Sequence, residues 1–374
     1  MISVTDFYNC LKVRGIGFFA GVPDSLLKEF CAYVDDHAAE GEHIICANEG
    51  NAIAMAAGYH LASAKVGLVY MQNSGLGNAT NPLLSLADRE VYGIPMILMI
   101  GWRGEPGVKD EPQHVKQGRV QLALLEAMEI PYEVIDAQCA DYEEIITSLQ
   151  ERALRESRPV AMVIRKGTFA EYKSAKKAEC AYTLSREEAL ETILLTDNSY
   201  AIVSTTGKSS RELYEIRERR GEKAQDFLTV GSMGHSSSIA AVIALARPEA
   251  RVMCIDGDGA LLMHMGALAV IGSLKPKNFV HVLINNYCHE SVGGQKSAIA
   301  ALDIALLAKA AGYEHYLCAE NKEELRRAIT EIKEMKGPVF LEVRVKAGSR
   351  ADLGRPKSST IDNKTAFMQK LGSR

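Results

Sequence analysis

The sequence alternates between short, continuously apolar segments and longer stretches with the apolar spacing of helices. The segments of the first kind are strand candidates, and they cover residues 16–20, 67–71, 96–100, 160–164, 201–204, 252–255, 280–284 and 339–343. Strands read as unbroken apolar runs when helices cover both faces of a parallel sheet. The pattern therefore predicts an α/β fold that is built on doubly wound parallel sheets.

A polar, lysine-rich segment interrupts this alternation in the middle of the chain. We expect residues 171–184 to be a linker between a first domain, residues 1–170, and a second domain, residues 185–374. A length of 374 residues is sufficient for two domains with separate cores. Ser185 and Glu188 have the spacing of a capping box and predict a helix start after the linker. From Lys346 the chain is irregular and basic, and a last short helix follows.

Composition excludes several classes of function. A net charge of -4 provides no general field that would attract nucleic acid or an anionic membrane. No apolar run reaches the roughly 18 residues of a membrane span, and the first residues lack the pattern of a signal peptide. The eight cysteines are scattered without a Cys-x-x-Cys pair, which favours free thiols over zinc, iron–sulfur or disulfide sites. We therefore expect a cytoplasmic protein with neither a nucleic-acid nor a membrane partner.

Two motifs follow neighbouring predicted strands in the second domain. Gly257-Asp258-Gly259 ends the strand at 252–255, and Asn285-Asn286 ends the strand at 280–284. Open α/β sheets bind ligands at the carboxyl ends of their strands, and carboxylate and amide oxygens suit a divalent cation. Taken alone, Gly257-Asp258-Gly259 is more simply explained as a tight turn.

The two motifs together resemble the cofactor motif of the thiamine diphosphate-dependent decarboxylase family. The resemblance implies a pyrimidine domain followed by a diphosphate domain, without the middle domain of larger relatives. It further implies that Mg2+ is bound by Asp258, Asn286 and the backbone carbonyl of Cys288. Glu49, which precedes a helix of small residues, matches the glutamate that activates the cofactor pyrimidine; the alternative is a first-turn residue favoured by the helix dipole.

Other segments match the same family. Met233 takes the place of the bulky apolar residue under the cofactor, although ordinary core packing is the alternative. The remaining cofactor contacts that the resemblance implies are Gly207, Gly231, Ser232, Gly257, Gly259 and Ala260. Gly207-Lys208-Ser209 does not continue a phosphate-binding P-loop, because residue 202, where the first glycine of that loop would stand, is isoleucine.

Within this family, the chain resembles the phosphonopyruvate decarboxylases at residues 18–25, 73–78, 103–114 and 348–356. Sulfopyruvate decarboxylases share the first three of these segments. The implied reaction is decarboxylation of the 2-oxo acid 3-phosphonopyruvate to phosphonoacetaldehyde and CO2 in phosphonate biosynthesis. Asp24 and His114 would handle protons, although Asp24 or Ser25 could instead cap a helix. Candidate substrate contacts are Ser25, Asn73, Arg103, Lys109 and Lys208. The family implies a homo-oligomer with active sites between subunits; the alternatives are a sulfopyruvate decarboxylase and a non-catalytic binding subunit.

Overall fold

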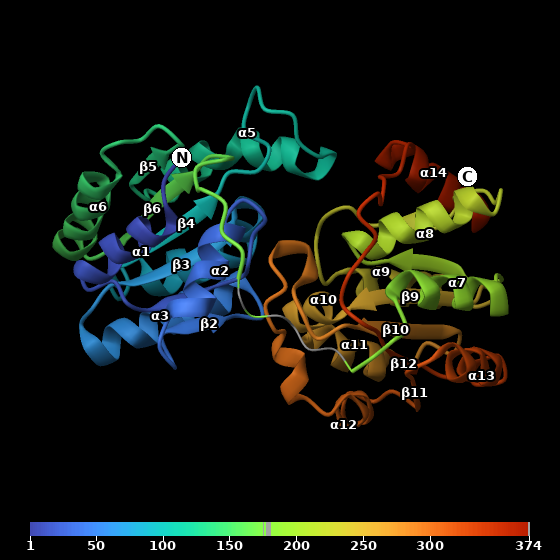
Figure 1. Ribbon diagram of the computed structural model, residues 1–374. Coiled ribbons are helices and arrows are strands. Elements are labelled where there is room, and N and C mark those ends of the chain that lie inside the picture. Colours follow the sequence, from blue (N-terminus) through green and yellow to red (C-terminus); the bar gives the residue numbers. More distant parts are fainter. Residues whose placement is uncertain (175, 177–180, 373–374) are drawn as a thin grey trace. The chain divides into compact units, whose positions relative to one another are not determined.

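The computed structural model describes residues 1–174, 176 and 181–372. Contacts divide the chain into two units, Met1–Lys177 with Val292–Gln295, and Ala178–Ser291 with Lys296–Arg374. We call them the N-terminal and the C-terminal unit, and both are drawn in Figure 1. Part of the predicted linker, residues 175 and 177–180, lies outside the described residues.

The N-terminal unit contains one parallel six-stranded sheet in the order β2-β1-β3-β4-β6-β5. In chain order its strands are β1 Phe19–Gly21, β2 His43–Ile45, β3 Gly67–Gln72, β4 Met96–Gly101, β5 Tyr132–Ile135 and β6 Pro159–Ile164. Its α-helices are α1 Val4–Val13, α2 Lys28–His37, α3 Glu49–Ser63, α4 Leu76–Pro82, α5 Pro112–Ala127 and α6 Tyr142–Glu156.

Helices cover both faces of this sheet (Figure 1). On β4, Ile97 and Met99 belong to a core cluster that includes Phe7 of α1 and Phe30 of α2. Leu98 and its neighbours on the opposite face belong to a second cluster, which α3 and α5 complete. Successive side chains of a strand point to opposite faces, so a continuously apolar strand supplies two cores at once.

The C-terminal unit repeats this architecture with the strand order β11-β12-β10-β9-β7-β8, again all parallel. Its strands are β7 Ala201–Ser204, β8 Phe227–Leu228, β9 Val252–Gly257, β10 Phe279–Asn285, β11 His315–Ala319 and β12 Val339–Arg344. Its α-helices are α7 Arg186–Thr196, α8 Lys208–Arg219, α9 Ser236–Ala246, α10 Asp258–Met263, α11 Gly266–Leu274, α12 Ile304–Ala310, α13 Lys322–Ile332 and α14 Thr360–Lys370.

The predicted fold class is confirmed, and each predicted apolar segment contributes to a strand. The segment at 16–20 is shifted, since β1 covers Phe19–Gly21. The capping box at Ser185 and Glu188 is present, with both of its reciprocal hydrogen bonds, at the start of α7. Among the described residues, no helix has the length and apolar character needed to cross a membrane.

Candidate active site

Four predicted site residues of the N-terminal unit lie at the carboxyl edge of its sheet. Asp24 and Ser25 follow β1, Asn73 follows β3, and Arg103 follows β4. These three strands are adjacent in the sheet, and the carboxyl edge is where α/β sheets of this kind bind ligands. Segments that are far apart in the sequence are therefore brought together by the strand order.

Arg103 connects these residues. Its Nη1 donates to Ser25 Oγ at 2.8 Å, and its backbone carbonyl accepts from Asn73 Nδ2 at 2.8 Å. The guanidinium also donates to both carboxylate oxygens of Asp110, at 2.8 and 2.5 Å. Burial raises the pKa of Asp110, but hydrogen bonds from Arg103 and from two backbone amides outweigh burial and hold that pKa well below its usual value. Asp110, which the sequence did not single out, thus neutralises the predicted substrate arginine.

Asp24 is 1% exposed and lies against the end of β4. Its Oδ2 accepts from the amide of Leu26 at 3.1 Å, and its Oδ1 is buried with no hydrogen-bond partner among the described residues. A Cβ at Gly101 would stand 2.1 Å from Asp24 Oδ2, so only glycine leaves room for this carboxyl group. The helix-cap alternative is wrong, because α2 has Leu27 as its N-cap and no side-chain cap. Burial raises the pKa of Asp24 to about 6, which suits proton transfer near neutral pH.

The raised pKa of Asp24 predicts that the folding stability of the protein depends on pH. Between the ordinary value of 3.8 and about 6, the folded state keeps a proton that the unfolded state has lost, so stability falls as pH rises through this range. Asp24→Asn removes this titration. Its stability relative to wild type is expected to improve by about 2 kcal/mol between pH 4 and pH 7. Urea unfolding can be followed by the fluorescence of Trp102, the single tryptophan, which lies in the same unit. A difference that does not change with pH would contradict the burial argument.

Glu49 is the first residue of α3 and is 5% exposed. The N-cap residue is Asn48, whose side chain accepts from the amide of Asn51 at 3.0 Å. Glu49 Oε2 accepts from Asn78 Nδ2 at 2.7 Å, and a Cβ at Gly75 would stand 2.4 Å from Glu49 Oε1. A separate residue therefore caps the helix, while the Glu49 carboxylate is oriented by α4.

The stretch from Asn73 to Asn78 contacts both Arg103 and Glu49. Its first residue is bonded to Arg103, and its last is bonded to Glu49. The role of Asn78 was missed by sequence reasoning, although it ends a segment already singled out by the family resemblance. Asn73 is the first residue of η1 Asn73–Gly75 and Asn78 lies in the first turn of α4, so the helical backbone sets the distance between them.

His114 and Lys109 belong to the loop and helix that follow β4. His114 lies in the first turn of α5 and is 8% exposed. A Cβ at Gly104 would stand 1.9 Å from the His114 carbonyl oxygen, so the residue after Arg103 packs directly on this turn. Lys109 is exposed, in the loop between them. The three candidate residues of this segment therefore differ: His114 is buried, Arg103 is paired with Asp110 and Lys109 faces solvent.

In the C-terminal unit, the predicted cofactor residues follow the four adjacent strands β10, β9, β7 and β8. Gly207 follows β7 with a φ of 92°, a left-handed conformation that favours glycine, and α8 begins at the next residue. Gly231, Ser232 and Met233 lie in the loop between β8 and α9. Gly257 ends β9, and Asp258, Gly259 and Ala260 form the first turn of α10. The tight-turn alternative for Gly257-Asp258-Gly259 is replaced by a direct strand-to-helix junction.

Asp258 and Asn286 present oxygens at neighbouring strand ends, since Gly257 of β9 pairs with Ile284 of β10. Asp258 is 7% exposed; its Oδ1 accepts from the amide of Gly259 at 2.8 Å, and its buried Oδ2 lacks a hydrogen-bond partner among the described residues. Burial raises the pKa of Asp258 to about 6, which reflects a carboxylate without a compensating charge. Asn286 Oδ1 accepts from the amide of Cys288 at 3.1 Å. A buried, incompletely bonded carboxylate oxygen beside an amide oxygen fits a hard divalent cation.

Met233 lies beside the same junction. From a Cβ built on Gly259, the Met233 Cε would be 3.7 Å away and the His289 ring 3.3 Å away. Ser232, the preceding residue, has a φ of 53°, which is uncommon for a residue with a Cβ. Burial lowers the pKa of His289 to about 4, so this imidazole is neutral at physiological pH. His289 was missed in the sequence, where nothing in its spacing distinguished it.

Lys208, a predicted substrate contact, is paired with a carboxylate in this unit. Its Nζ lies 2.6 Å from Glu290 Oε1. Glu290 also accepts from Arg186 Nη1 at 2.9 Å and from Asn286 Nδ2 at 3.0 Å. Asn285 points elsewhere, since its Nδ2 donates to the buried Glu342 at 2.8 Å. Only the second asparagine of the pair is therefore available at the predicted metal position.

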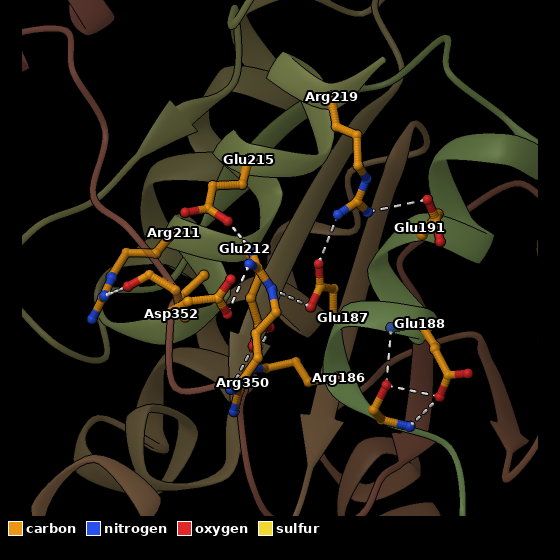
Figure 2. Close-up of polar contacts among 12 residues, drawn as sticks. Arg186, Glu187, Glu188, Glu191, Arg211, Glu212, Glu215, Arg219, Arg350 and Asp352 are labelled. Atoms are coloured by element: carbon orange, nitrogen blue, oxygen red, sulfur yellow. Dashed lines mark hydrogen bonds and ion pairs between the residues drawn. The ribbon is translucent and has the colours of Figure 1, made fainter.

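The C-terminal tail that carries the fourth family segment lies on α7 and α8. Arg350 bonds to Glu187 of α7, at 2.9 Å, and to Glu215 of α8, as Figure 2 shows. Arg211, in the first turn of α8, donates to the carbonyl of Gly354 at 2.6 Å. A Cβ at Gly354 would stand 2.6 Å from Glu215 Oε1, so the tail comes close to the helix there. These contacts attach the tail to the helix whose N-terminus follows Gly207.

Comparison with known proteins identifies relatives over nearly the whole chain. Two family profiles match: the thiamine pyrophosphate enzyme N-terminal TPP binding domain at residues 4–125, and the C-terminal TPP binding domain at residues 205–343. A phosphonopyruvate decarboxylase of Streptomyces viridochromogenes is 33% identical over 96% of this chain and 92% of its own. Another, from Streptomyces hygroscopicus, is 34% identical over 96% and 91%. A sulfopyruvate decarboxylase of Methanosarcina acetivorans is 29% identical over 91% and 90%.

Proposed function

We propose, because this chain belongs to the thiamine pyrophosphate enzymes, that it decarboxylates 3-phosphonopyruvate to phosphonoacetaldehyde and CO2. The substrate is assigned from the near-complete match to two phosphonopyruvate decarboxylases, which are 33% and 34% identical to this chain. The match to a sulfopyruvate decarboxylase is weaker, at 29%. The proposed reaction is a step of phosphonate biosynthesis.

Residues of each unit have a proposed role toward thiamine diphosphate. When bound, thiamine diphosphate provides the electron sink that decarboxylation of a 2-oxo acid requires. Gly207, Gly231, Ser232, Gly257, Gly259 and Ala260 would contact the cofactor, with Met233 packed against it. Asp258, Asn286 and the carbonyl of Cys288 would hold Mg2+; the buried Oδ2 of Asp258 supports this assignment. The carboxylate of Glu49 would face the pyrimidine, held by Asn78.

The substrate is proposed to bind near Asp24, Ser25, Asn73 and Arg103. A guanidinium has five N–H donors, and the bonds to Asp110 and Ser25 use three of them. Arg103 can therefore still donate to a carboxylate or phosphonate, while Asp110 fixes its orientation. Lys109 is exposed and could add charge, and Lys208 would first have to leave Glu290. Asp24 and His114 remain the proposed proton-handling groups.

A homo-oligomer with active sites between subunits is part of the proposal. Helices α9 and α11 leave large apolar side chains uncovered, with Val242 59% and Val270 58% exposed. Leu245 and Leu274 on the same two helices are 44% and 45% exposed. A second copy of the chain would bury such a surface, because exposed apolar patches mark association sites.

The test of substrate is a direct comparison of two acids. With thiamine diphosphate and Mg2+ present, kcat/KM for phosphonopyruvate is expected to exceed that for sulfopyruvate by at least about 10-fold, since the two headgroups differ in charge at neutral pH. A coupled aldehyde assay measures both. The reverse preference would favour the sulfopyruvate alternative. Binding of cofactor without CO2 release from either acid would favour a non-catalytic subunit.

A further inference from the structure

Glu290 joins three segments of the C-terminal unit that the proposed mechanism does not otherwise connect. Its carboxylate accepts from Arg186 at the start of α7, from Lys208 at the start of α8, and from Asn286 after β10. Its side chain is 11% exposed, so water contributes little to its solvation. Every partner is a donor, and together they occupy both carboxylate oxygens.

These contacts determine which way the Asn286 amide faces. An asparagine amide can rotate by half a turn, which exchanges its oxygen and its nitrogen, and only the oxygen can bind a hard cation. Glu290 Oε2 lies 3.0 Å from Nδ2 and accepts from it, while the amide of Cys288 donates to Oδ1 at 3.1 Å. The reversed amide would set an oxygen against a carboxylate and an NH2 group against a backbone N–H. Both contacts would then be repulsive.

Charge balance explains why a carboxylate can occupy this position. Arg186 is paired with Glu212 as well as with Glu290, and Lys208 is paired with Glu290. The charges of the two cations and the two carboxylates sum to zero. The negative charge of Glu290 is therefore compensated without a metal ion. The ion pairs with Arg186, at 2.9 Å, and with Lys208, at 2.6 Å, favour the charged form of the Glu290 side chain.

We infer that Glu290 is a positioning residue, which holds the amide oxygen of Asn286 toward the divalent cation and is itself held by Arg186 and Lys208. The inference rests on the proposed cofactor site and extends it by a residue that does not touch the metal. Groups that orient metal ligands in this way typically change metal affinity by about 10- to 100-fold when they are removed.

The experiment compares Glu290→Met with Glu212→Met. Methionine has nearly the length of glutamate but no side-chain oxygen that could accept from Asn286. Both variants remove one of the two carboxylates that pair with Arg186, but only Glu290 contacts Asn286. Mn2+ is titrated into the full-length protein with thiamine diphosphate present, and free Mn2+ is measured by electron paramagnetic resonance. Glu290→Met is expected to weaken Mn2+ binding by about 10- to 100-fold, and Glu212→Met by less than about 3-fold. Raised Mg2+ is expected to restore the kcat of Glu290→Met, because the defect is one of metal affinity.

A second variant covers the case in which Glu290→Met does not fold. Glu290→Asp keeps the charge that Arg186 and Lys208 require but is one methylene shorter, so it loses reach to Asn286 and is expected to bind Mn2+ more weakly. Wild-type Mn2+ affinity in a folded Glu290 variant, or an equal loss in Glu212→Met, would overturn the inference. Absence of decarboxylation by wild type would instead reject the proposed function and leave the Mn2+ comparison interpretable.

Discussion

Asp258→Ala is expected to abolish decarboxylation and to remove the stabilisation of the protein by thiamine diphosphate and Mg2+. The substitution takes away the only charged side chain among the proposed metal ligands, so metal affinity should fall by more than about 100-fold. A ligand at 100 times its Kd stabilises the folded state by about 2.7 kcal/mol, which corresponds to a rise in Tm of roughly 5–10 °C for a domain of this size. Thermal unfolding with and without cofactor and metal measures the effect.

The apo protein provides an internal check on this substitution. In wild type without a cation, burial leaves the Asp258 carboxyl group with a raised pKa of about 6, so its removal should cost little stability. Asp303→Ala is a suitable control, because Asp303 caps α12 through the amide of Leu306 and makes no hydrogen bond or ion pair with a proposed metal ligand within the described part of the chain. That control should lose about 1 kcal/mol of stability and keep its cofactor-dependent rise in Tm. A normal rise in Asp258→Ala would show that the metal is bound elsewhere.

Glu49→Gln is expected to lower kcat by about 10²- to 10⁴-fold while cofactor binding changes little. Glutamine has the shape of glutamate and can still accept from Asn78, so the local packing is retained. Only the ability to hold a proton at the cofactor pyrimidine is lost. Steady-state kinetics at saturating cofactor and calorimetric titration of thiamine diphosphate measure the two quantities separately.

The helix-dipole alternative for Glu49 makes the opposite prediction. A carboxylate that only stabilises the first turn of α3 contributes up to about 1 kcal/mol to folding, and its loss would leave kcat unchanged. Glu42→Gln is the matched control, since Glu42 is a surface residue paired with Lys12. Equal kcat values for wild type, Glu42→Gln and Glu49→Gln would reject the catalytic assignment.

The residues that pair with the predicted site residues could not be identified from the sequence. Asp258 and Asn286 were found because each follows an apolar strand, whereas Asp24 and Glu49 were assigned through the family resemblance. Asp110, which restrains Arg103 through a bidentate pair, lies in a loop that also contains other charged residues. A surface charge and a buried partner look alike in sequence. Their difference depends on how the loop folds.

The extent of burial separates the strands that were predicted from the sequence from those that were missed. All four missed strands, β2, β5, β8 and β11, are the edges of the two sheets. Central strands such as β4 and β10 are buried along their whole length, whereas β2 is only partly buried at each residue and β5 has exposed and buried positions. An edge strand is covered less completely, so it lacks the continuous apolar run that identifies a parallel strand.

The sequence by itself therefore determined the fold class, the central strands and the motifs Gly257-Asp258-Gly259 and Asn285-Asn286 at the ends of two of them, because burial on two faces imposes an apolar run and the polar residues follow directly after it. Tertiary structure decided the edges of the sheets, the pairing of Arg103 with Asp110 and the grouping of Asn286, Glu290 and Lys208. Strand order brings Lys208 to Glu290, 82 residues away in the chain, whereas Arg103 and Asp110 are 7 residues apart in one loop whose fold sets their pairing. Neither kind of contact leaves a periodic pattern in the sequence.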